Sequence, residues 1–377
     1  MDESGDDNCA GENVVRHIYV HIPFCARICP YCAFYKERAD PAQTGRFCKS
    51  ILGELGASRT NCFKPRTIFF GGGTPTALTT TQVALLLDGF HELLDLSELT
   101  EWTFEANPGS VSERKALLLR ERGVNRISLG VQSFDDRLLE LLGRDHSAAQ
   151  AEVSFKLLRR AGFENLNIDL MFGLPGQTLE QWTQTLRRAV ALQPDHVSAY
   201  CLTYEEDTDF FLRHARGEFR VDAETDATFF ETTTEVLAKA GLAQYEISNF
   251  ARSGFESVHN RAYWQGENYL GIGPSAVSTV GLRRWQNVCD YRAYADRVAA
   301  GESASTGDEI LTPKMKRAEA IALGLRTGAG IPAQWMTNWP NEVAEFVDLG
   351  LMQRDARRVV LTPSGRLLAD SVAEAFV

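Results

Sequence analysis

The sequence predicts an α/β fold in which six βα units form an open, parallel (β/α)6 partial barrel, followed by an α+β region. Short apolar runs rich in β-branched and aromatic residues alternate with helix-like segments over roughly the first 200 residues. The character of the sequence changes after about residue 215. Because 377 residues exceed the usual size of one domain, a large domain and a smaller one are expected.

Six strands and the helices between them are predicted from the spacing of apolar residues. The strands are expected at 18–22, 67–70, 102–105, 126–130, 166–171 and 196–202. The helices, in which apolar residues recur every three or four positions, are expected at 42–56, 80–94, 112–122, 147–161 and 178–191. This alternation favours a parallel sheet, because parallel strands need a crossover connection.

Three cysteines follow the first strand, in the run Cys25-Ala-Arg-Ile-Cys29-Pro-Tyr-Cys32. Structural zinc takes four protein ligands, and no second Cys/His pair at zinc spacing follows. Three thiolates suit a [4Fe–4S] cluster that keeps one iron open to another ligand. Cys25, Cys29 and Cys32 are therefore predicted to bind such a cluster, the alternatives being a zinc-stabilised binding module or ordinary buried cysteines.

The remaining cysteines, the charge and the hydropathy exclude several classes of protein. The net charge of −11 argues against a broad nucleic-acid surface, and the basic cluster Lys314-Met-Lys-Arg317 is expected to be a solvated helix face. No secretory signal or membrane span is visible, so a cytoplasmic protein is expected. Most of the scattered cysteines are expected to be packing residues or surface thiols rather than a disulfide framework: Cys9, Cys48, Cys62, Cys201 and Cys289.

Glycines and polar residues gather in the loops after the predicted strands. These loops contain Gly71-Gly-Gly-Thr-Pro75, Glu105-Ala-Asn-Pro-Gly109, Gly130-Val-Gln132, and Asp169 with Gly173-Leu-Pro-Gly176. The carboxyl ends of barrel strands are where active sites form, so a ligand site is predicted there. The glycine run allows close approach to the backbone, but it lacks the Gly-x-Gly-x-x-Gly pattern and the P-loop lysine, so neither nucleotide-binding motif is supported.

The cysteine spacing resembles the radical S-adenosylmethionine (SAM) superfamily, and Tyr19-Val-His-Ile-Pro-Phe-Cys25 resembles its coproporphyrinogen oxidase-like branch. The resemblance, which covers about residues 18 to 275, implies a partial TIM barrel of radical SAM type. It also implies a [4Fe–4S] cluster and bound SAM, whose one-electron reduction can yield a 5′-deoxyadenosyl radical. Cofactor-binding roles, and no catalytic role, follow for Tyr19, Tyr31, Gly72, Gly73, Thr74, Glu105, Gln132, Arg144, Asp169 and Cys201.

Two features separate branches of that family. Oxygen-independent coproporphyrinogen III oxidases of the resembling type carry a fourth cysteine two residues after the third, whereas the haem chaperones known as HemW do not; this chain has Phe34 there. The string His259-Asn-Arg-Ala-Tyr-Trp264 resembles the His-Asn-x-x-Tyr-Trp motif of HemW. His259 is therefore expected to face haem, beside flat aromatic surfaces. Without the family match, a helix packed by its aromatics is the simpler interpretation, and Cys289 and His146 are weaker candidates for the iron.

One segment departs from the family pattern. The usual Gly-x-Gly-x-Gly-Ala-His-Ser is replaced here by Gly271-Ile-Gly-Pro-Ser-Ala-Val-Ser278, in which Ser275 and Val277 stand for a glycine and a histidine. If that histidine contributes to haem contact, this chain lacks the contact.

The predicted organisation has four parts. They are a disordered tail over 1–15, a radical SAM barrel over 16–215, an α+β extension over 216–300 and a winged-helix-like cap over 301–377. A short hairpin is expected at Val359-Val-Leu-Thr-Pro-Ser-Gly365, and the cap is expected to cover the barrel or dock a partner. Acidic residues argue against DNA binding by the cap: Glu342, Glu345 and Asp348.

The function that the sequence favours is that of a haem chaperone, which carries haem as cargo to an apo-haemoprotein. The resemblance suggests a respiratory enzyme as the recipient, approached peripherally at a membrane, and it allows a homodimer. The alternative is an oxygen-independent coproporphyrinogen III oxidase, which decarboxylates propionate side chains in porphyrin biosynthesis. Because Phe34 replaces the fourth cysteine, coproporphyrinogen dehydrogenase activity is not expected.

Overall fold

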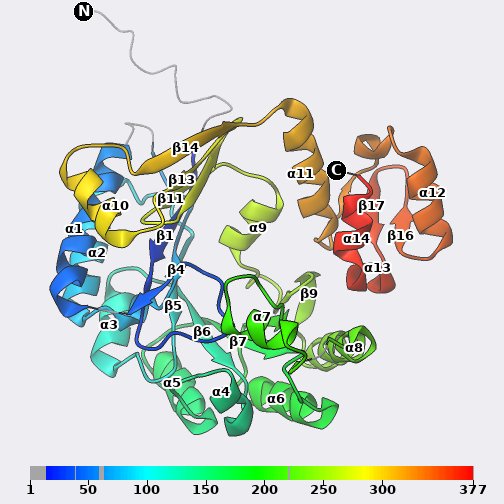
Figure 1. Cartoon of the computed structure of the whole chain (residues 1–377), viewed down its shortest axis with the longest axis horizontal. Coiled ribbons are helices and arrows are strands. Elements are labelled where there is room, and N and C mark those ends of the chain that lie inside the picture. Colours follow the sequence, from blue (N-terminus) through cyan, green and yellow to red (C-terminus); the bar gives the residue numbers. More distant parts are fainter. Residues whose placement is uncertain (1–13, 39, 59–62, 220, 377) are drawn as a thin grey trace, which may run out of the picture.

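A computed structural model describes residues 14–38, 40–58, 63–219 and 221–376 (Figure 1). The disordered tail predicted over 1–15 falls mainly on residues 1–13, which lie outside the described residues. Among the helices of the described ranges, none is both long and apolar enough to cross a bilayer.

Six parallel strands form the barrel and confirm the predicted strands to within two residues at each end. In spatial order they are β1 (His17–Ile22), β4 (Thr67–Gly72), β5 (Glu101–Ala106), β6 (Arg126–Gln132), β7 (Asn165–Phe172) and β8 (His196–Cys201). Side chains alternate between the two faces of a strand. One set, such as Ile68 and Phe70 of β4, joins the main hydrophobic core beneath the helices, and the other set faces the barrel interior.

The helices that follow the strands cover the outside of the barrel (Figure 1). They are α1 (Pro41–Ser58), α2 (Thr80–Leu93), α3 (Glu113–Glu121), α5 (Ala148–Arg160), α6 (Leu179–Ala191) and α8 (Ala223–Lys239), and the first five confirm the predicted helices. Capping boxes fix the starts of α2, α5 and α6, at Thr79, Ser147 and Thr178. Trp182 of α6 is fully buried and donates its indole N–H to Thr233 Oγ1 of α8 at 3.0 Å.

The barrel is open because its outer strands, β1 and β8, do not pair with each other. Each of them pairs with a further strand of the same sheet. β8 pairs antiparallel with β10 (Asn249–Ala251), which pairs with β9 (Ala243–Glu246). β1 pairs in parallel with β11 (Tyr269–Ile272), and an antiparallel ribbon follows: β12 (Val277–Val280), β13 (Arg283–Asn287) and β14 (Ser305–Ile310). β14 therefore belongs to the main sheet, although it lies in the 301–377 stretch assigned to the cap from the sequence.

Several shorter elements lie in the connections. They are β2 (Phe24–Cys25), β3 (Glu37–Arg38), η1 (Pro75–Ala77), α4 (Asp136–Leu141), α7 (Asp209–Ala215), α9 (Val258–Trp264) and α10 (Tyr291–Ala299). Most of them are too short to give a clear apolar periodicity, so the sequence did not reveal them. β2 and β3 pair in parallel and bring the two ends of the cysteine loop together.

The C-terminal residues form a separate small unit beside the barrel, joined to it through α11 (Figure 1). After α11 (Pro313–Leu325) come β15 (Ile331–Pro332), η2 (Ala333–Met336), α12 (Pro340–Asp348), β16 (Met352–Arg354), β17 (Arg358–Leu361), α13 (Pro363–Leu367) and α14 (Ala369–Glu374). The strands form their own sheet, in the order β15-β17-β16, over their own hydrophobic core.

The hairpin predicted at 359–365 is placed wrongly. The hairpin consists of β16 and β17, which are antiparallel, and only residues 359–361 of the predicted segment are strand. Thr362 caps α13 by accepting a hydrogen bond from Gly365 N, and Pro363 occupies the first helical turn. A threonine followed by proline is a helix start, because proline there loses no hydrogen bond.

Ser275 has a left-handed backbone, with φ of 63°, at the position where the family pattern has glycine. Its β-carbon makes this conformation costly. Ser275→Gly should therefore raise the free energy of unfolding by about 0.5–1 kcal/mol. The substitution removes the strain energy of the left-handed serine, and the greater conformational entropy of glycine in the unfolded chain offsets part of this gain. Urea denaturation measures this change.

Ser253 supplies the control, because it is exposed and is not among the described residues with positive φ. Ser253→Gly should lower stability slightly, since it only adds unfolded-state entropy. If Ser275→Gly is no more stable than the native chain, the strain at Ser275 is refuted.

Candidate cofactor-binding site

A cavity of about 600 Å³ opens at the carboxyl ends of the barrel strands. Its walls come from the cysteine loop and from the loops after the strands. Most of the site residues predicted from the sequence line it: Cys25, Cys29, Tyr31, Cys32, Gly72, Gly73, Thr74, Glu105, Gln132, Arg144, Asp169 and Cys201. Two others, Tyr19 and His259, lie elsewhere.

Hydrogen bonds to its main-chain carbonyl groups hold the cysteine loop in place. Cys32 N donates to Cys29 O at 3.3 Å, and Lys36 Nζ donates to the carbonyl oxygens of Cys32 and Phe34. None of the described cysteines forms a disulfide. Burial raises the pKa of the Cys25 thiol to about 11, and the nearby thiols of Cys29 and Cys32 contribute to the rise.

The three thiols suit a cluster better than a single metal ion. Within the described ranges, no three His, Cys, Asp or Glu side chains are grouped closely enough to hold one ion. An iron–sulfur cluster is larger than an ion and takes one thiolate for each iron. Three cysteines of one loop that share a cavity wall therefore fit a [4Fe–4S] cluster and not a mononuclear zinc site.

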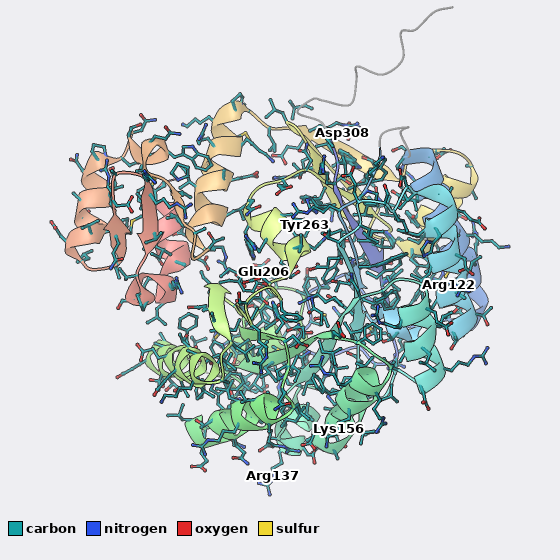
Figure 2. All side chains as sticks on the ribbon, turned by 180° about the vertical axis from the view of Figure 1, so that it is seen from behind. Arg122, Arg137, Lys156, Glu206, Tyr263 and Asp308 are labelled. Atoms are coloured by element: carbon teal, nitrogen blue, oxygen red, sulfur yellow. The ribbon has the colours of Figure 1, made fainter. Side chains whose placement is uncertain are left out.

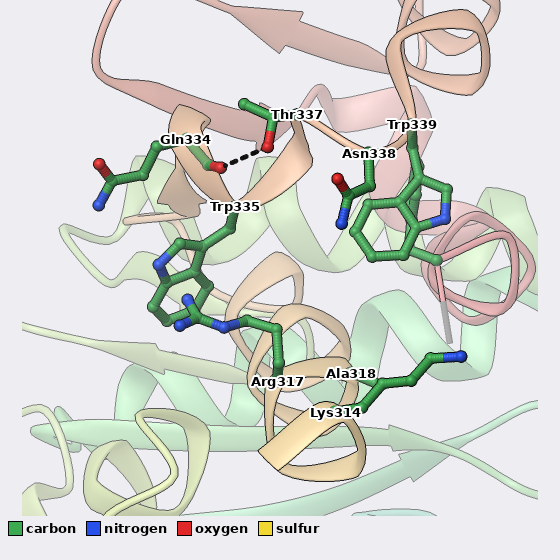
Figure 3. A pocket seen from close by; sticks show the side chains of 9 residues that line it. Lys314, Arg317, Ala318, Gln334, Trp335, Thr337, Asn338 and Trp339 are labelled. Carbon is green, nitrogen blue, oxygen red and sulfur yellow. Dashed lines mark hydrogen bonds between the residues drawn. The ribbon is translucent and has the colours of Figure 1, made fainter.

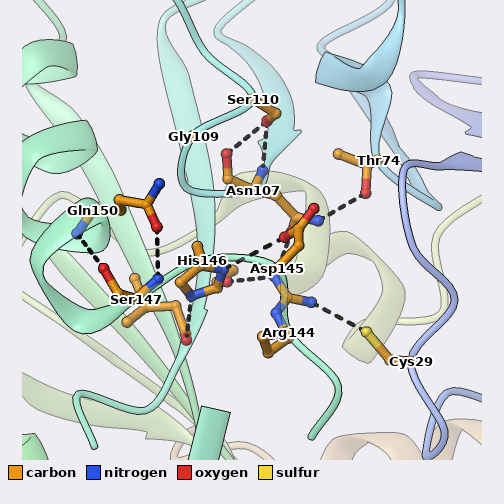
Figure 4. Close-up of polar contacts among 12 residues, drawn as sticks. Cys29, Thr74, Asn107, Gly109, Ser110, Arg144, Asp145, His146, Ser147 and Gln150 are labelled. Atoms are coloured by element: carbon orange, nitrogen blue, oxygen red, sulfur yellow. Dashed lines mark hydrogen bonds and ion pairs between the residues drawn. The ribbon is translucent and has the colours of Figure 1, made fainter. Parts of the chain in front are cut away.

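Arg144 connects the cysteine loop to two other loops (Figure 4). Its Nη1 lies 3.6 Å from Cys29 Sγ, and its Nη2 donates to Asn107 Oδ1 at 2.6 Å. Asn107 donates to Thr74 Oγ1 at 3.0 Å, and Thr74 Oγ1 lies 3.7 Å from Cys25 Sγ. The Nε of Arg144 is buried without a partner in the described structure. This cation is thus fixed beside the cysteines and suits a negatively charged ligand group.

The glycines at the end of β4 are needed for packing against the cysteine loop, and they also leave room for a ligand to approach the backbone. Gly72 has φ of 102°, and a β-carbon there would lie 2.4 Å from the His21 ring. A β-carbon on Gly73 would lie 2.6 Å from the carbonyl carbon of Pro23. Gly72 N donates to Glu105 Oε2 at 3.2 Å. The absence of side chains lets the end of β4 lie directly against the start of the cysteine loop.

Two buried carboxyl groups form a wall that suits a cation. The pKa of Glu105 is raised to about 8, first by burial and then by the neighbouring Asp169. Burial also raises the pKa of Asp169, although Ser128 Oγ and Asn167 Nδ2 donate to its carboxylate at 2.9 and 2.7 Å. A positively charged ligand group would stabilise the ionised form of both acids.

Gln132 lies on strained backbone at the cavity. Its φ is 66°, and the register of β6 against β7 shifts between Gly130 and Gln132, as in a β-bulge. A left-handed non-glycine residue costs on the order of 1–3 kcal/mol, and such strain gathers at functional sites. The bulge turns the end of β6 so that Gln132 lines the cavity.

Tyr31 and Cys201 line the cavity from different elements. Tyr31, in the cysteine loop, packs against Phe210 of α7 with ring centroids 6.2 Å apart. Cys201, at the end of β8, is exposed to the cavity. The pKa of its thiol is raised to about 12, first by burial and then by Asp226 of α8. Both side chains are thus placed to contact a ligand, and the thiol is neutral.

Tyr19 and His259 lie within the barrel, away from the cavity lining. Tyr19 Oη lies 3.0 Å from His21 Nδ1 on the same strand. His259, on α9, is 1% exposed, and its Nδ1 lies 2.7 Å from the hydroxyl of Thr67, the first residue of β4. It therefore stands at the amino ends of the strands, opposite to the cysteines. Burial lowers the pKa of His259 to about 3, and its Nε2 is buried without a partner in the described structure.

The other candidates for iron are also outside the cavity lining. His146 is buried, and its Nε2 lies 3.1 Å from Val131 O. Cys289 is exposed after β13, and Cys48 is buried in the main core. Cys9 and Cys62 lie outside the described residues.

Several residues that line the cavity were not identified from the sequence. Asn107 is the clearest, because it bridges Arg144 and Thr74; a polar residue before Pro-Gly, just after a strand, is the signal that could have revealed it. The others give no comparable signal: Arg27, Lys36, Ser128, Met171, Tyr200, Thr203 and Glu205.

Residues 19–189 match the family model of the radical SAM superfamily. Heme chaperone HemW of Lactococcus lactis is 37% identical, over 95% of this chain and 96% of that protein, and HemW of Bacillus subtilis is 36% identical over 96% and 99%. The mitochondrial radical S-adenosyl methionine domain-containing protein 1 of Bos taurus is 33% identical over 94% and 86%.

Among solved structures, coproporphyrinogen III oxidase HemN of Escherichia coli, a radical SAM enzyme, superposes with a TM-score of 0.83 at 24% identity, over 98% of this chain and 91% of that one. At this identity the superposition shows the fold, a radical SAM partial TIM barrel with its C-terminal unit. The near full-length identity to the bacterial proteins is more specific, and by it the chain belongs to the HemW family, within the HemN-like branch of the radical SAM superfamily.

Proposed function

We propose that this protein is a haem chaperone, which binds haem and delivers it to apo-haemoproteins. The observation that carries the proposal is the near full-length relation to proteins named heme chaperone. Phe34 supports it, because this side chain lies where the oxidases of the branch carry a further cysteine. It lines the cavity and is 68% exposed, so the site has no thiol at that position.

The residues of the cavity support binding of a [4Fe–4S] cluster and SAM. Cys25, Cys29 and Cys32 would hold the cluster, which when bound supplies an open iron and a source of one electron. Arg144 would bind the carboxylate of SAM. The charges of Glu105 and Asp169 suit its ammonium and sulfonium groups.

The remaining contacts to SAM follow from the loops around the cavity. The glycine run gives the amino group access to the backbone, and Thr74 fixes that loop to the cysteine loop. The side chains proposed to complete the contacts are Tyr31, Gln132 and Cys201. Tyr19, which does not line the cavity, would act only through its contact with His21 Nδ1. In this function SAM and the cluster serve structure, dimerisation or control, and the work is transfer of haem.

We propose His259 as the axial ligand of haem, with Tyr263 and Trp264 beside the ring. A neutral imidazole with an unpartnered Nε2 is the form that binds iron. Because the ring is buried against Phe69, at 5.1 Å between centroids, α9 must move away from the sheet for the iron to reach it.

The proposal assigns a task to each part of the chain. Residues 16–215 hold the cluster and SAM, residues 216–300 carry the aromatic motif, and the C-terminal unit serves as a cap or docking unit. The recipient is an apo-haemoprotein such as a respiratory enzyme, which a cytoplasmic, dimer-forming chaperone would approach at the membrane surface.

Cys29→Ser should abolish the broad iron–sulfur absorbance of the anaerobically reconstituted protein, because the serine hydroxyl does not replace a thiolate on iron. Cys289→Ser, which removes an exposed thiol outside the cavity, is the matched control and should keep the absorbance. Iron and sulfide analysis checks both variants. An unchanged spectrum in Cys29→Ser excludes the cluster at this loop.

The protein with its cluster, SAM and a strong reductant should not convert coproporphyrinogen III to protoporphyrinogen IX, because Phe34 supplies no thiol. Anaerobic incubation followed by chromatography of the oxidised porphyrins measures the conversion. Turnover above the level of the Cys29→Ser variant would make the protein an oxidase. This is the alternative function, which the fold shared with HemN allows.

His259→Gln should weaken haem binding about tenfold or more, since an amide keeps a hydrogen-bond partner for Thr67 but does not ligate iron well. A Soret titration measures the affinity, and cluster absorbance should stay the same. His91→Gln, at an exposed histidine of α2, is the control. Equal affinity in His259→Gln and the native protein removes His259 as the ligand.

A further inference from the structure

A second cavity, of about 690 Å³, lies in the C-terminal unit (Figure 3). It is formed by α11, by η2 and the turn after it, and by the end of the chain. Its main lining side chains are Lys314, Arg317, Trp335, Trp339 and Phe376. It is separate from the cysteine cavity, with which it shares no lining residue.

Aromatic side chains form its walls. Trp335 and Trp339 stand on either side of the opening in Figure 3, and both are partly exposed. The guanidinium of Arg317 lies over the Trp335 ring, 4.4 Å from its centroid. Trp339 packs edge to face with Phe376, which holds its position. The cavity therefore offers flat apolar surfaces that are fixed in place.

Among the described residues, the charged side chains that line the cavity are both positive. Lys314 and Arg317 lie about one turn apart on α11, and neither forms an ion pair with a described residue. No carboxylate of residues 14–38, 40–58, 63–219 or 221–376 lines the cavity. In a chain of net charge −11, two cations without counter-ions beside two indoles attract an anionic, flat ligand.

The lining also limits how such a ligand is held. The part of the lining that the structure describes contains no His, Cys, Met or Tyr, and so offers no usual ligand for a haem iron. Gln334, Thr337 and Asn338 add only neutral polar groups. A ligand bound here would be recognised through its own planar ring and its negatively charged groups. A metal at the centre of that ring would not add to the binding energy.

A neighbouring cavity links this site to the aromatic motif. Trp335 lines both the C-terminal cavity and a third one, of about 600 Å³, between α9, β9 and α11. Trp264, the last residue of the His-Asn-x-x-Tyr-Trp string, lines the third cavity together with Arg261 and Arg366. A ligand that leaves the C-terminal cavity past Trp335 therefore meets further indole and guanidinium groups.

We propose that the C-terminal cavity is a docking site for the porphyrin of haem, which lies between Trp335 and Trp339 with its two propionates at Lys314 and Arg317. This inference rests on the proposed function and adds to it a second site that binds porphyrin independently of iron. A planar dicarboxylate matches two flat walls and two cations better than a peptide does, because a peptide backbone also needs paired N–H and C=O groups.

The test uses metal-free protoporphyrin IX and haem, titrated separately into the full-length protein. The double variant Lys314→Glu/Arg317→Glu should bind metal-free protoporphyrin about tenfold more weakly than the native protein. The matched control, Arg137→Glu/Lys156→Glu, reverses two charges on helices at the far side of the molecule from the C-terminal unit and should bind normally (Figure 2). Trp339→Leu should lose affinity as well, and Trp339→Phe should keep most of it.

The outcomes separate this inference from the proposed function. The docking site is refuted if the native protein and the Lys314→Glu/Arg317→Glu variant bind metal-free protoporphyrin equally well. It is also refuted if the native protein binds haem but does not bind metal-free protoporphyrin. In both cases the chaperone function stands. If neither haem nor porphyrin binds, both proposals fail. If the variant binds porphyrin normally but no longer delivers haem to an apo-haemoprotein, the cavity docks an acidic partner segment and the porphyrin site is refuted.

Discussion

Alternate side chains of each barrel strand point into the barrel, and several of these inward side chains are charged or polar. Arg126 is 1% exposed, and its charge lowers the pKa of both Glu105 and Asp169 against the effect of burial. Asn167 donates to Asp169 and lies 2.7 Å from His196. Burying any one of these groups alone would cost several kcal/mol, so each depends on the others. The acids at the cysteine cavity are thus held by the barrel interior.

The same interior also positions the aromatic motif at the other end of the strands. The buried carboxylate of Glu101 accepts hydrogen bonds from Val258 N at 2.7 Å and from Ser257 Oγ and His259 N at 3.2 Å, which ties the start of α9 to β5. His17 and His259 share the hydroxyl of Thr67. A movement of α9 that frees His259 must break these contacts. Haem binding at this place would therefore be coupled to the barrel that is proposed to hold the cofactors.

The sequence predicted the barrel strands, their helices and most of the cysteine cavity because these depend on local patterns: apolar periodicity, cysteine spacing and glycine-rich strand ends. It did not predict features that depend on long-range pairing. The antiparallel ribbon after β11 has no strong periodicity, and Asn107 acquires a role only when its loop meets Arg144. The depth of His259 follows from contacts with β4 and β5, which its motif does not encode. Lys314 and Arg317 are exposed on α11, as predicted for a solvated helix face. The sequence did not predict that Arg317 lies over the ring of Trp335, a residue just beyond β15.

A haem chaperone, the function proposed for this protein, would have to release its cargo, and the two proposed haem sites differ in a way that suits release. Iron coordinated by a histidine binds tightly, and each tenfold in affinity costs about 1.4 kcal/mol to undo. A cavity that holds the ring only by stacking and by exposed cations contributes modest affinity, because such ion pairs are worth about 0–1 kcal/mol each. Exchange between a buried imidazole and an open, iron-independent site would let the porphyrin remain bound while its iron is free to take a ligand from the recipient. The C-terminal unit would meet this need under the proposal, since its cavity opens on the surface and shares Trp335 with the cavity beside α9.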